Sequence, residues 1–469
     1  MLLPMSPTDS MFLLGESREH PMHVGALALF TPPEGMSVTQ VRGMFDGALA
    51  RGAVAPLLRQ RARRAVTTLG QWGWETLEPA DVDLEHHVRV DALPQPGGTD
   101  QLMALVSRLH AGLLDRSRPL WEMHLIEGLA DGRYAVYTKI HHALTDGVAG
   151  MQLLRRALSA DPDAREMPAP WEPRATPPRP PAGPVAGNVT PFALPGTALR
   201  TARAAAAEVA GLAPALAGTL DRAVRAGGGP LTLTAPHSVL NVPIGGARSF
   251  AARSWPLERL KLVAKHADAT INDVVLTMCG GALRTLLTGL GALPDSPLIA
   301  MVPVSLRGEH DGNSGNSSGN KIGTLMCPLG TDLPDPAHRL QAVRAGMGQG
   351  KAAMRSLSHT QNLAMSALGA APIAVGMLLG RGGPIRPPNI LISNVPGPDT
   401  PLYWNGARLD ALYPLSIPVD GQALNIAATS TDDQIAFGLT GCRRAVPDLH
   451  PMLDHLDDEL DALERAAGL

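Results

Sequence analysis

The sequence predicts an α+β protein made of two halves that a proline-rich crossover joins. Three observations predict this fold class. Short strand-like and helix-like runs alternate up to about residue 160. Residues 167–195 are then dense in proline, and a second mixed region begins near residue 249. We therefore expect a first half at 1–165, a linker and crossover at 166–235 and a second half at 236–469.

The first half contains one clear helix among several strands. Alternating apolar residues predict a strand over 23–30, and leucines at helical spacing predict a helix over 100–115. Strands are expected at 122–127 and 133–140, with a turn at Asp131-Gly132 between them.

The crossover cannot carry a helix or a central strand where proline is dense, because proline lacks a backbone donor. Residues 198–226 are rich in alanine, which favours helix, but Pro214 predicts two short helices or a kinked one. In the second half, helices are expected at 257–266 and 272–290 and a buried strand at 298–304. A hairpin at 424–431 and 434–440 and an amphipathic C-terminal helix complete the elements.

The composition excludes several classes of protein. Hydrophobic residues make up 45% of the 469 residues and charged residues 18%, so a large core is expected. The formal net charge of -3 gives no reason to expect a nucleic-acid partner. Three widely separated cysteines lack metal-ligand spacing and suit a reducing cytosol. No secretory signal is expected at the N-terminus.

One uncharged segment, residues 361–380, resembles a membrane span in length. It contains Pro372 and few large aliphatic side chains, so a buried helix or one lying on a lipid surface is favoured.

The most informative motif is the run HHALTDG at residues 141–147. It follows a predicted strand and precedes a predicted helix, so rigid elements would hold a histidine side chain at their corner. Asp146 can fix the loop, and Gly147 allows close backbone approach. This layout is typical of a histidine general base, and we assign that role to His142.

A second pair, His86-His87, also spells HHxxxD with Asp91. Residues 83–91 are predicted to be an extended strand, in which residues four apart are separated by about 13 Å. Asp91 could not then fix His87 locally, so we interpret this pair as an exposed or edge-strand feature.

The HHxxxDG motif resembles the signature of the bacterial wax ester synthase/diacylglycerol acyltransferase family. Eight further blocks keep the order of that family along nearly the whole chain: MSPTD from Met5, PMHVG from Pro21, PLWE from Pro119, INDVV from Ile271, VPVSLR from Val302 to Arg307, GNKIG from Gly319, SNVPGP from Ser393, and GQALNI from Gly421. The resemblance implies two chloramphenicol-acetyltransferase-like halves with the active site in the channel between them.

The resemblance also implies roles for single residues. Asp146 would point away from the histidines and pair with an arginine, for which Arg307 is the candidate. Asn272 would lie near the active site, and it could also cap the helix that begins at the next residue. Pro119, Trp121 and Asn394 are candidates for the substrate channel, and a core position is the alternative for Trp121.

The expected function is transfer of a long-chain fatty acyl group from acyl-CoA to diacylglycerol, giving triacylglycerol. Fatty alcohols are expected as further acceptors, giving wax esters. The catalytic set is His142, His141 and Asp146, supported by Gly147, Asn272 and Arg307. His141 is expected to support geometry. No metal or other cofactor is required, because acyl-CoA is itself a substrate.

Two alternatives stay open from the sequence. The first is a condensation-type acyltransferase of secondary metabolism, and the second is a non-catalytic lipid-binding protein. The expected location is the cytoplasm, with peripheral docking on membranes or lipid bodies through residues 198–226 or 361–380. The sequence does not predict the oligomeric state.

Overall fold

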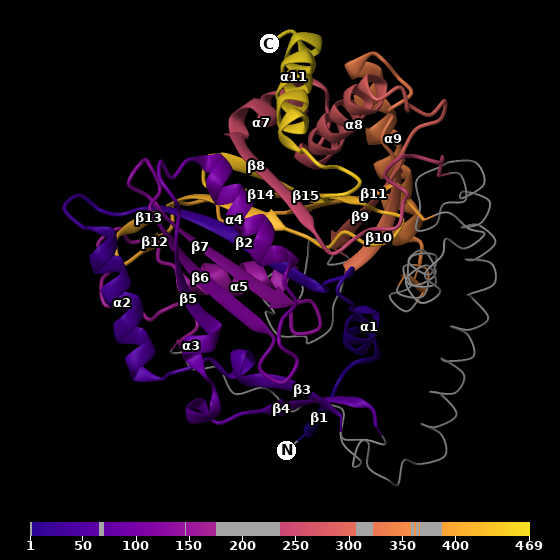
Figure 1. The fold of residues 1–469 in the computed structure, drawn as a ribbon. Helices are drawn as coiled ribbons and strands as arrows, with labels where there is room; N and C mark the ends of the chain where they lie inside the picture. The colour runs from indigo at the N-terminus through magenta and orange to yellow at the C-terminus, as the bar shows by residue number, and fades with distance from the viewer. Residues whose placement is uncertain are drawn as a thin grey trace, which may run out of the picture.

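The structure is a computed structural model that describes residues 2–64, 70–145, 147–174, 235–305, 322–357, 361–362, 365 and 387–469. The expectations for residues 198–226, for Asp146 and Arg307, and for most of 361–380 lie outside these residues. The described residues form two lobes, each built on a six-stranded sheet (Figure 1).

The N-terminal lobe has the strand order β12-β13-β2-β7-β6-β5. Four of these strands come from the first half of the sequence: β2 (His23–Thr31), β5 (Val88–Ala92), β6 (Trp121–Glu127) and β7 (Tyr134–His141). The other two, β12 (Tyr403–Trp404) and β13 (Ala407–Leu415), come from the second half. In Figure 1 β13 lies beside the indigo β2, so the two halves of the chain interlock in this sheet.

Helices cover both faces of the N-terminal sheet. The helix α4 (Thr99–Ala111) packs on the face that carries Leu27 and Tyr137. The helices α2 (Val38–Arg51) and α5 (Gly147–Ala157) lie on the opposite face, with Ala28 and Val136. At one end are the short helices α1 (Pro7–Gly15) and α3 (Leu84–His87) and a small sheet of β1 (Leu2–Pro4), β4 (Trp72–Thr76) and β3 (Gln60–Arg64).

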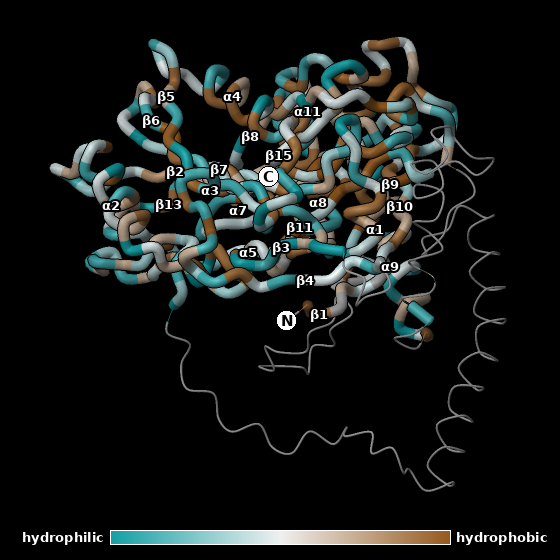
Figure 2. Tube along the Cα trace, turned by 60° about the horizontal axis from the view of Figure 1, so that its bottom comes forward, coloured by the Kyte–Doolittle hydropathy of each residue, from teal (hydrophilic) through white to brown (hydrophobic). Residues whose placement is uncertain are grey.

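The C-terminal lobe has the strand order β10-β9-β11-β14-β15-β8. Its helices gather over the sheet in Figure 1, and Figure 2 shows the hydrophobic stretches of the chain that form its interior. The elements are β8 (Arg248–Pro256), α7 (Leu257–His266), α8 (Ile271–Gly289), β9 (Ile299–Ser305), β10 (Ile322–Pro328), α9 (Pro336–Arg355), β11 (Ile390–Val395), β14 (Leu424–Thr431), β15 (Gln434–Cys442) and α11 (His450–Ala467).

The two lobes are joined by hydrogen bonds close to the end of α4. The hydroxyl of Ser107 accepts a bond of 2.9 Å from the Phe250 N–H, and Nε2 of His110 lies 3.0 Å from the Ser416 carbonyl oxygen. The Arg248 guanidinium donates to the Glu19 carbonyl at 2.7 Å. These bonds set the position of the C-terminal lobe against the segment that follows α1.

Most elements predicted from periodicity are confirmed, including α7 and β14 to the residue, but two local predictions were wrong. Residues 84–87 are helical rather than extended, because the Asp83 side chain accepts the His86 N–H at 3.2 Å and starts a helical turn. Asn272 does not cap α8. The cap is Thr270, which exchanges hydrogen bonds with Asp273 in a capping box, so Asn272 is the second helical residue.

Within the described ranges, no helix is both long and apolar enough to cross a membrane. The same residues contain no group of three His, Cys, Asp or Glu side chains that could hold a metal ion. All three cysteines are buried and unpaired, and burial raises the pKa of Cys327 to about 12.

Candidate active site

The HHxxxDG motif lies at the predicted strand-to-helix corner. β7 ends at His141, α5 begins at Gly147, and the intervening described residues form a tight turn. The Leu144 N–H donates to the His141 carbonyl at 2.9 Å, and the His142 N–H donates to the Met22 carbonyl at 2.8 Å. The backbone of both histidines is therefore fixed by neighbouring strands before any substrate arrives.

His141 is held in one tautomer. Its Nδ1 accepts the Ala143 N–H at 3.1 Å, so Nδ1 carries no proton in this arrangement. Its Nε2 then carries the proton and lies 3.3 Å from Oε1 of Glu16. With both ring nitrogens engaged and the side chain fully buried, His141 is suited to holding the corner in shape.

Glu16 is the carboxylate behind His141, and its side chain is only 2% exposed. Arg116 binds it at 2.7 Å through Nε and also donates to the Leu13 carbonyl at 2.8 Å. Burial alone would raise the pKa of Glu16, but the His141 imidazole and the Arg116 guanidinium outweigh it and lower that pKa. Glu16 therefore stays ionised and ties the end of α1 to His141.

His142 contacts a residue within α1 itself. Its ring stacks on Phe12 with a centroid distance of 4.2 Å and an interplanar angle of 19°. His142 is half-buried, whereas His141 is buried. Phe12 of α1 and Glu16, the residue after α1, thus contact the two histidines, one through an aromatic ring and the other through a carboxylate.

A buried polar layer continues from His141 along the same face of β7. Nζ of Lys139 lies 3.0 Å from Glu122 on β6 and donates to the carbonyls of Leu109 and Gly112 at the end of α4. Burial would raise the pKa of Glu122, but His124 and Lys139 lower it to about 2. The ammonium of Lys139 satisfies carbonyls that the helix end leaves free, so it anchors α4 to the sheet.

Two more histidines complete this layer. Nε2 of His23 lies 2.7 Å from the His110 carbonyl, and Nδ1 of His110 lies 2.9 Å from the Tyr137 hydroxyl. Burial lowers the pKa of His110 to about 3 and that of His23 well below its ordinary value, so both stay neutral. Gly25 gives them room, since a Cβ there would meet Tyr137, Thr138 and His110 within 3.1–3.3 Å.

The other predicted site residues are spread over both lobes. Gly147 is the exposed first residue of α5, Asn272 is half-buried near the start of α8, and Asn394 is half-buried on β11. Trp121 is almost fully buried, donates from Nε1 to the Leu58 carbonyl at 2.8 Å and stacks on His87. Pro119 lines a polar surface hollow with His87 and Arg118.

The expected exposed or edge-strand position of His87 was wrong. Its Nδ1 lies 2.7 Å from the Trp121 carbonyl oxygen, and burial lowers its pKa to about 4. His87 is therefore a core histidine, and its ring belongs to the packing around Trp121.

The sequence interpretation missed Glu16, Phe12 and Arg116. Glu16 is the residue that follows α1, and Arg116 lies in a loop 100 residues later, so no local spacing connects them. Glu16 comes shortly after the Met5 block and before the Pro21 block, and that position is the one signal that could have directed attention to it.

Comparisons with known proteins agree with this geometry. The profile of the wax ester synthase/diacylglycerol acyltransferase catalytic domain matches residues 5–275, and that of the C-terminal domain matches residues 318–464. A Mycobacterium tuberculosis protein, provisionally named a diacylglycerol O-acyltransferase, is 56% identical over 472 residues, covering 99% of this chain and 91% of the relative.

Solved structures show the same relation. The wax ester synthase/diacylglycerol acyltransferase from Marinobacter aquaeolei VT8 is 39% identical, with a TM-score of 0.78 and full coverage of both chains. The first condensation domain of the CDA synthetase is 17% identical, with a TM-score of 0.58 over 100% of this chain and 96% of that one. At that identity the second likeness shows the shared two-lobed fold.

Proposed function

Because this chain belongs to the wax ester synthase/diacylglycerol acyltransferase family, we propose that it moves a long-chain fatty acyl group from acyl-CoA to diacylglycerol, with His142 as general base. One observation carries the choice of base. The two ring nitrogens of the buried His141 face the Ala143 N–H and the Glu16 carboxylate. The half-buried His142 stacks on the ring of Phe12. Long-chain alcohols are proposed as further acceptors, which would give wax esters.

The reaction needs one positioned base. The acceptor hydroxyl oxygen attacks the thioester carbonyl carbon while the neutral imidazole of His142 takes the hydroxyl proton, which typically contributes about 10²–10⁴ in rate. The tetrahedral intermediate then collapses, and the carbon–sulfur bond breaks. His142 returns the proton to the departing thiolate of coenzyme A, and the ester is left as product.

The oxyanion of the intermediate requires preorganised donors. We propose Asn272 as one contributor, because its half-buried place in the first turn of α8 suits a side chain that faces a channel. Asp146 and Arg307 are proposed to pair and to hold the loop after His142, as the resemblance implies. Pro119, Trp121 and Asn394 remain proposals for the substrate channel.

An assay of product formation tests the proposal. Purified protein is incubated with radiolabelled palmitoyl-CoA and either diacylglycerol or hexadecanol, and labelled products are separated by thin-layer chromatography. We expect labelled triacylglycerol, with wax ester in the second reaction. Tight binding of the thioester without any labelled ester would favour the non-catalytic lipid-binding alternative.

We also propose that the enzyme docks reversibly on membranes or lipid bodies, because diacylglycerol resides in lipid. Residues 198–226 and 361–380 remain candidates from the sequence. Among the described residues, α1 adds support, since Met11 is 56% and Leu14 58% exposed beside Phe12. Exposed apolar side chains of this size suit insertion at a lipid surface.

Liposome flotation tests this docking. Substitution of Met11 and Leu14 by serine should weaken flotation with vesicles that contain diacylglycerol. The matched control is Leu290→Ser, which removes a 61% exposed leucine at the end of α8. Equal flotation of all three proteins would remove α1 from the docking surface.

A further inference from the structure

A tight turn at residues 17–20 follows α1 and closes on itself. The backbones of Ser17 and His20 exchange two hydrogen bonds of 3.2 Å, and the Ser17 hydroxyl oxygen lies 3.1 Å from Nδ1 of His20. These bonds link the first and last residues of the turn. A contact that displaces one of its carbonyls therefore displaces the whole turn.

The turn connects two groups that fix the histidines of the HHxxxDG motif. The residue before it is Glu16, whose carboxylate lies 3.3 Å from Nε2 of His141. Shortly after the turn, the Met22 carbonyl accepts the His142 N–H at 2.8 Å. The Met22 N–H donates to the Glu16 carboxylate at 3.4 Å, which joins the two groups. A shift of the turn would therefore move the groups that hold both histidines.

The C-terminal lobe holds this turn through Arg248, the first residue of β8. The Arg248 guanidinium donates to the Glu19 carbonyl at 2.7 Å and to the carbonyl of Ala247, in its own loop, at 3.3 Å. Arg248 is 3% exposed, and burial lowers its pKa to about 10, so it stays charged at neutral pH. Among the described residues, no carboxylate pairs with this guanidinium. Carbonyl oxygens of two segments stabilise the buried cation, and one of them belongs to the turn.

The same loop touches the backbone of the turn at Gly246. A Cβ at this glycine would lie 2.6 Å from the Arg18 carbonyl oxygen, which is closer than side chains normally approach. At the neighbouring Gly245, a Cβ would meet nothing within 4 Å. The loop therefore lies directly against the turn at one glycine and has open space beside the other.

A further contact to the turn comes from Asp420, in the segment between β13 and β14. Its Oδ1 lies 3.0 Å from Nε2 of His20 and accepts the Ile244 N–H at 2.8 Å. The side chains of His20 and Asp420 are mostly buried, so salt in the solvent screens their contact little. Asp420 thus joins the turn to the loop that leads to Arg248.

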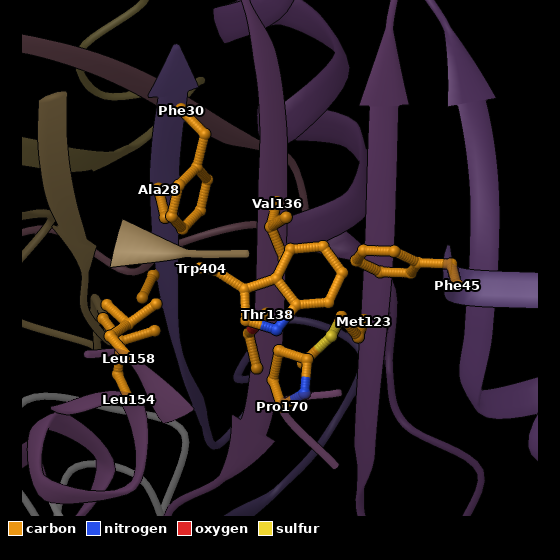
Figure 3. A pocket seen from close by; sticks show the side chains of 11 residues that line it. Ala28, Phe30, Phe45, Met123, Val136, Thr138, Leu154, Leu158, Pro170 and Trp404 are labelled. Atoms are coloured by element: carbon orange, nitrogen blue, oxygen red, sulfur yellow. The ribbon is translucent and has the colours of Figure 1, made fainter. Parts of the chain in front are cut away.

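The segment that carries Asp420 is anchored in the N-terminal lobe before it reaches the turn. In Figure 3 the Trp404 indole lies among side chains of that lobe, with Phe45 beside it. The two rings meet edge to face with centroids 5.2 Å apart, and Nε1 of Trp404 donates to the Pro168 carbonyl at 3.1 Å. From Trp404 the chain runs through β13, which pairs with β2, and then reaches Asp420. The contacts with the turn are therefore made from a fixed base.

We propose that Arg248 is a positioning residue for the acyl transfer, and that with Gly246 it holds the turn at residues 17–20 and, through the turn, the two histidines. This role rests on the proposed function, which places the general base at His142. The Arg248 guanidinium bonds to backbone carbonyls of the loop and the turn, so its effect on the histidines passes through the turn. A lysine cannot replace it, because an ammonium is a point donor and lacks the planar fork that reaches two segments.

The first test changes the contact without changing any charge. Gly246→Ala places a methyl group against the Arg18 carbonyl and should displace the turn. We expect kcat for transfer from palmitoyl-CoA to diacylglycerol to fall roughly tenfold or more, with KM for palmitoyl-CoA within about twofold of wild type. Gly245→Ala is the matched control and should keep the wild-type kcat, because its methyl group meets open space.

Arg248→Lys tests the guanidinium itself. It should lower kcat in the same way, because the ammonium cannot bridge the Glu19 carbonyl and the loop. Its control is Arg444→Lys, since Arg444 is exposed and donates to the Pro243 carbonyl of the same loop at 2.6 Å. Thermal unfolding shows whether each variant is folded. If Arg248→Lys does not fold, Gly246→Ala still tests the proposal.

A double-mutant cycle separates positioning from a general loss of stability. Gly246→Ala is combined with Glu16→Gln, and kcat is measured for the two single variants and the double variant. If both changes act on the histidines through the same turn, the combined loss is smaller than the product of the separate losses. Losses that multiply, in folded variants, would show that the two residues act independently and would contradict the proposal.

Hydrogen exchange separates this role from the proposed function, because it does not depend on activity. Exchange of the His142 N–H reports its bond to the Met22 carbonyl, and we expect it to be roughly tenfold faster in Gly246→Ala than in Gly245→Ala. An inactive wild type would refute the transfer reaction, yet this difference would still support the positioning role. Equal exchange in the two glycine variants would refute that role. With an active wild type, an unchanged kcat in folded Gly246→Ala would overturn the positioning role alone.

Discussion

His141 and His142 are adjacent in sequence but have different surroundings. Alternation along β7 directs His141 to the face of Lys139, where Glu16 and Ala143 engage both ring nitrogens. His142 follows the last strand residue and stacks on Phe12. The proposed division of roles between a positioning and a reacting histidine therefore follows from the place where the strand ends.

For single residues, we predict that Glu16→Gln lowers turnover about 10- to 100-fold. A small displacement of a reacting group can lower the reaction rate by about that factor. The amide keeps the size of the side chain but removes the charge between His141 and Arg116. Steady-state assays with palmitoyl-CoA measure the effect. Glu19→Gln is the control, since Glu19 is an exposed carboxylate three residues later. Normal turnover in Glu16→Gln would show that His141 needs no carboxylate.

A second prediction concerns the Asp146–Arg307 pair. If the two interact, Asp146→Asn and Arg307→Gln should be non-additive in a double-mutant cycle of unfolding free energy. Loss of one partner of a fully buried pair typically costs about 3–5 kcal/mol. Strict additivity would mean that Asp146 pairs with another group.

At the scale of elements, α4 is fastened to the sheet by a buried charge. Lys139 satisfies the Leu109 and Gly112 carbonyls while its charge is balanced by Glu122. We predict that Lys139→Met destabilises the fold by about 3–5 kcal/mol, because it removes the cation closest to the buried Glu122 carboxylate. Urea unfolding of Lys139→Met and of the Lys139→Met/Glu122→Gln double variant measures this. A double variant no more stable than the single one would contradict the pairing.

The elements also show which parts of the fold hydrophobic periodicity can predict. Sustained patterns predicted α7, β14 and the HHxxxDG corner well, because each has a continuous buried face. The pattern failed at residues 84–87, where the Asp83 cap turns an apparently alternating run into one helical turn. It also misplaced the cap of α8, where the Thr270–Asp273 capping box competes with Asn272.

Contacts between segments far apart in the chain could not be predicted from the sequence alone. Glu16 and Arg116 meet through the packing of α1 against the loop after α4, and Trp404 reaches the N-terminal lobe on a strand from the second half. Such pairs depend on the topology of the fold, which local spacing does not encode.

For the whole molecule, the buried neutral histidines predict a sensitivity to acid. The pKa of His110 in the fold is about 3 and that of His87 about 4, both below the ordinary value of about 6.5. The unfolded chain therefore binds more protons below pH 6.5, and stability falls as pH drops, by about 1.4 kcal/mol per pH unit for each such histidine. Above pH 6.5 these groups add no slope.

Thermal unfolding between pH 7.5 and 5 measures this slope. His110→Gln should flatten it, whereas His266→Gln, at an exposed position on α7, should leave it unchanged. An unchanged slope in His110→Gln would show that other groups govern the acid sensitivity.

We propose above that His142 takes the acceptor proton at a corner that the fold has already fixed. The most direct test compares wild type and His142→Ala in single-turnover transfer from radiolabelled palmitoyl-CoA to diacylglycerol, with thermal unfolding of both. We expect that the variant unfolds at nearly the same temperature, binds palmitoyl-CoA and forms ester at least about 10²-fold more slowly. Ester formation at the wild-type rate by the folded variant would contradict it.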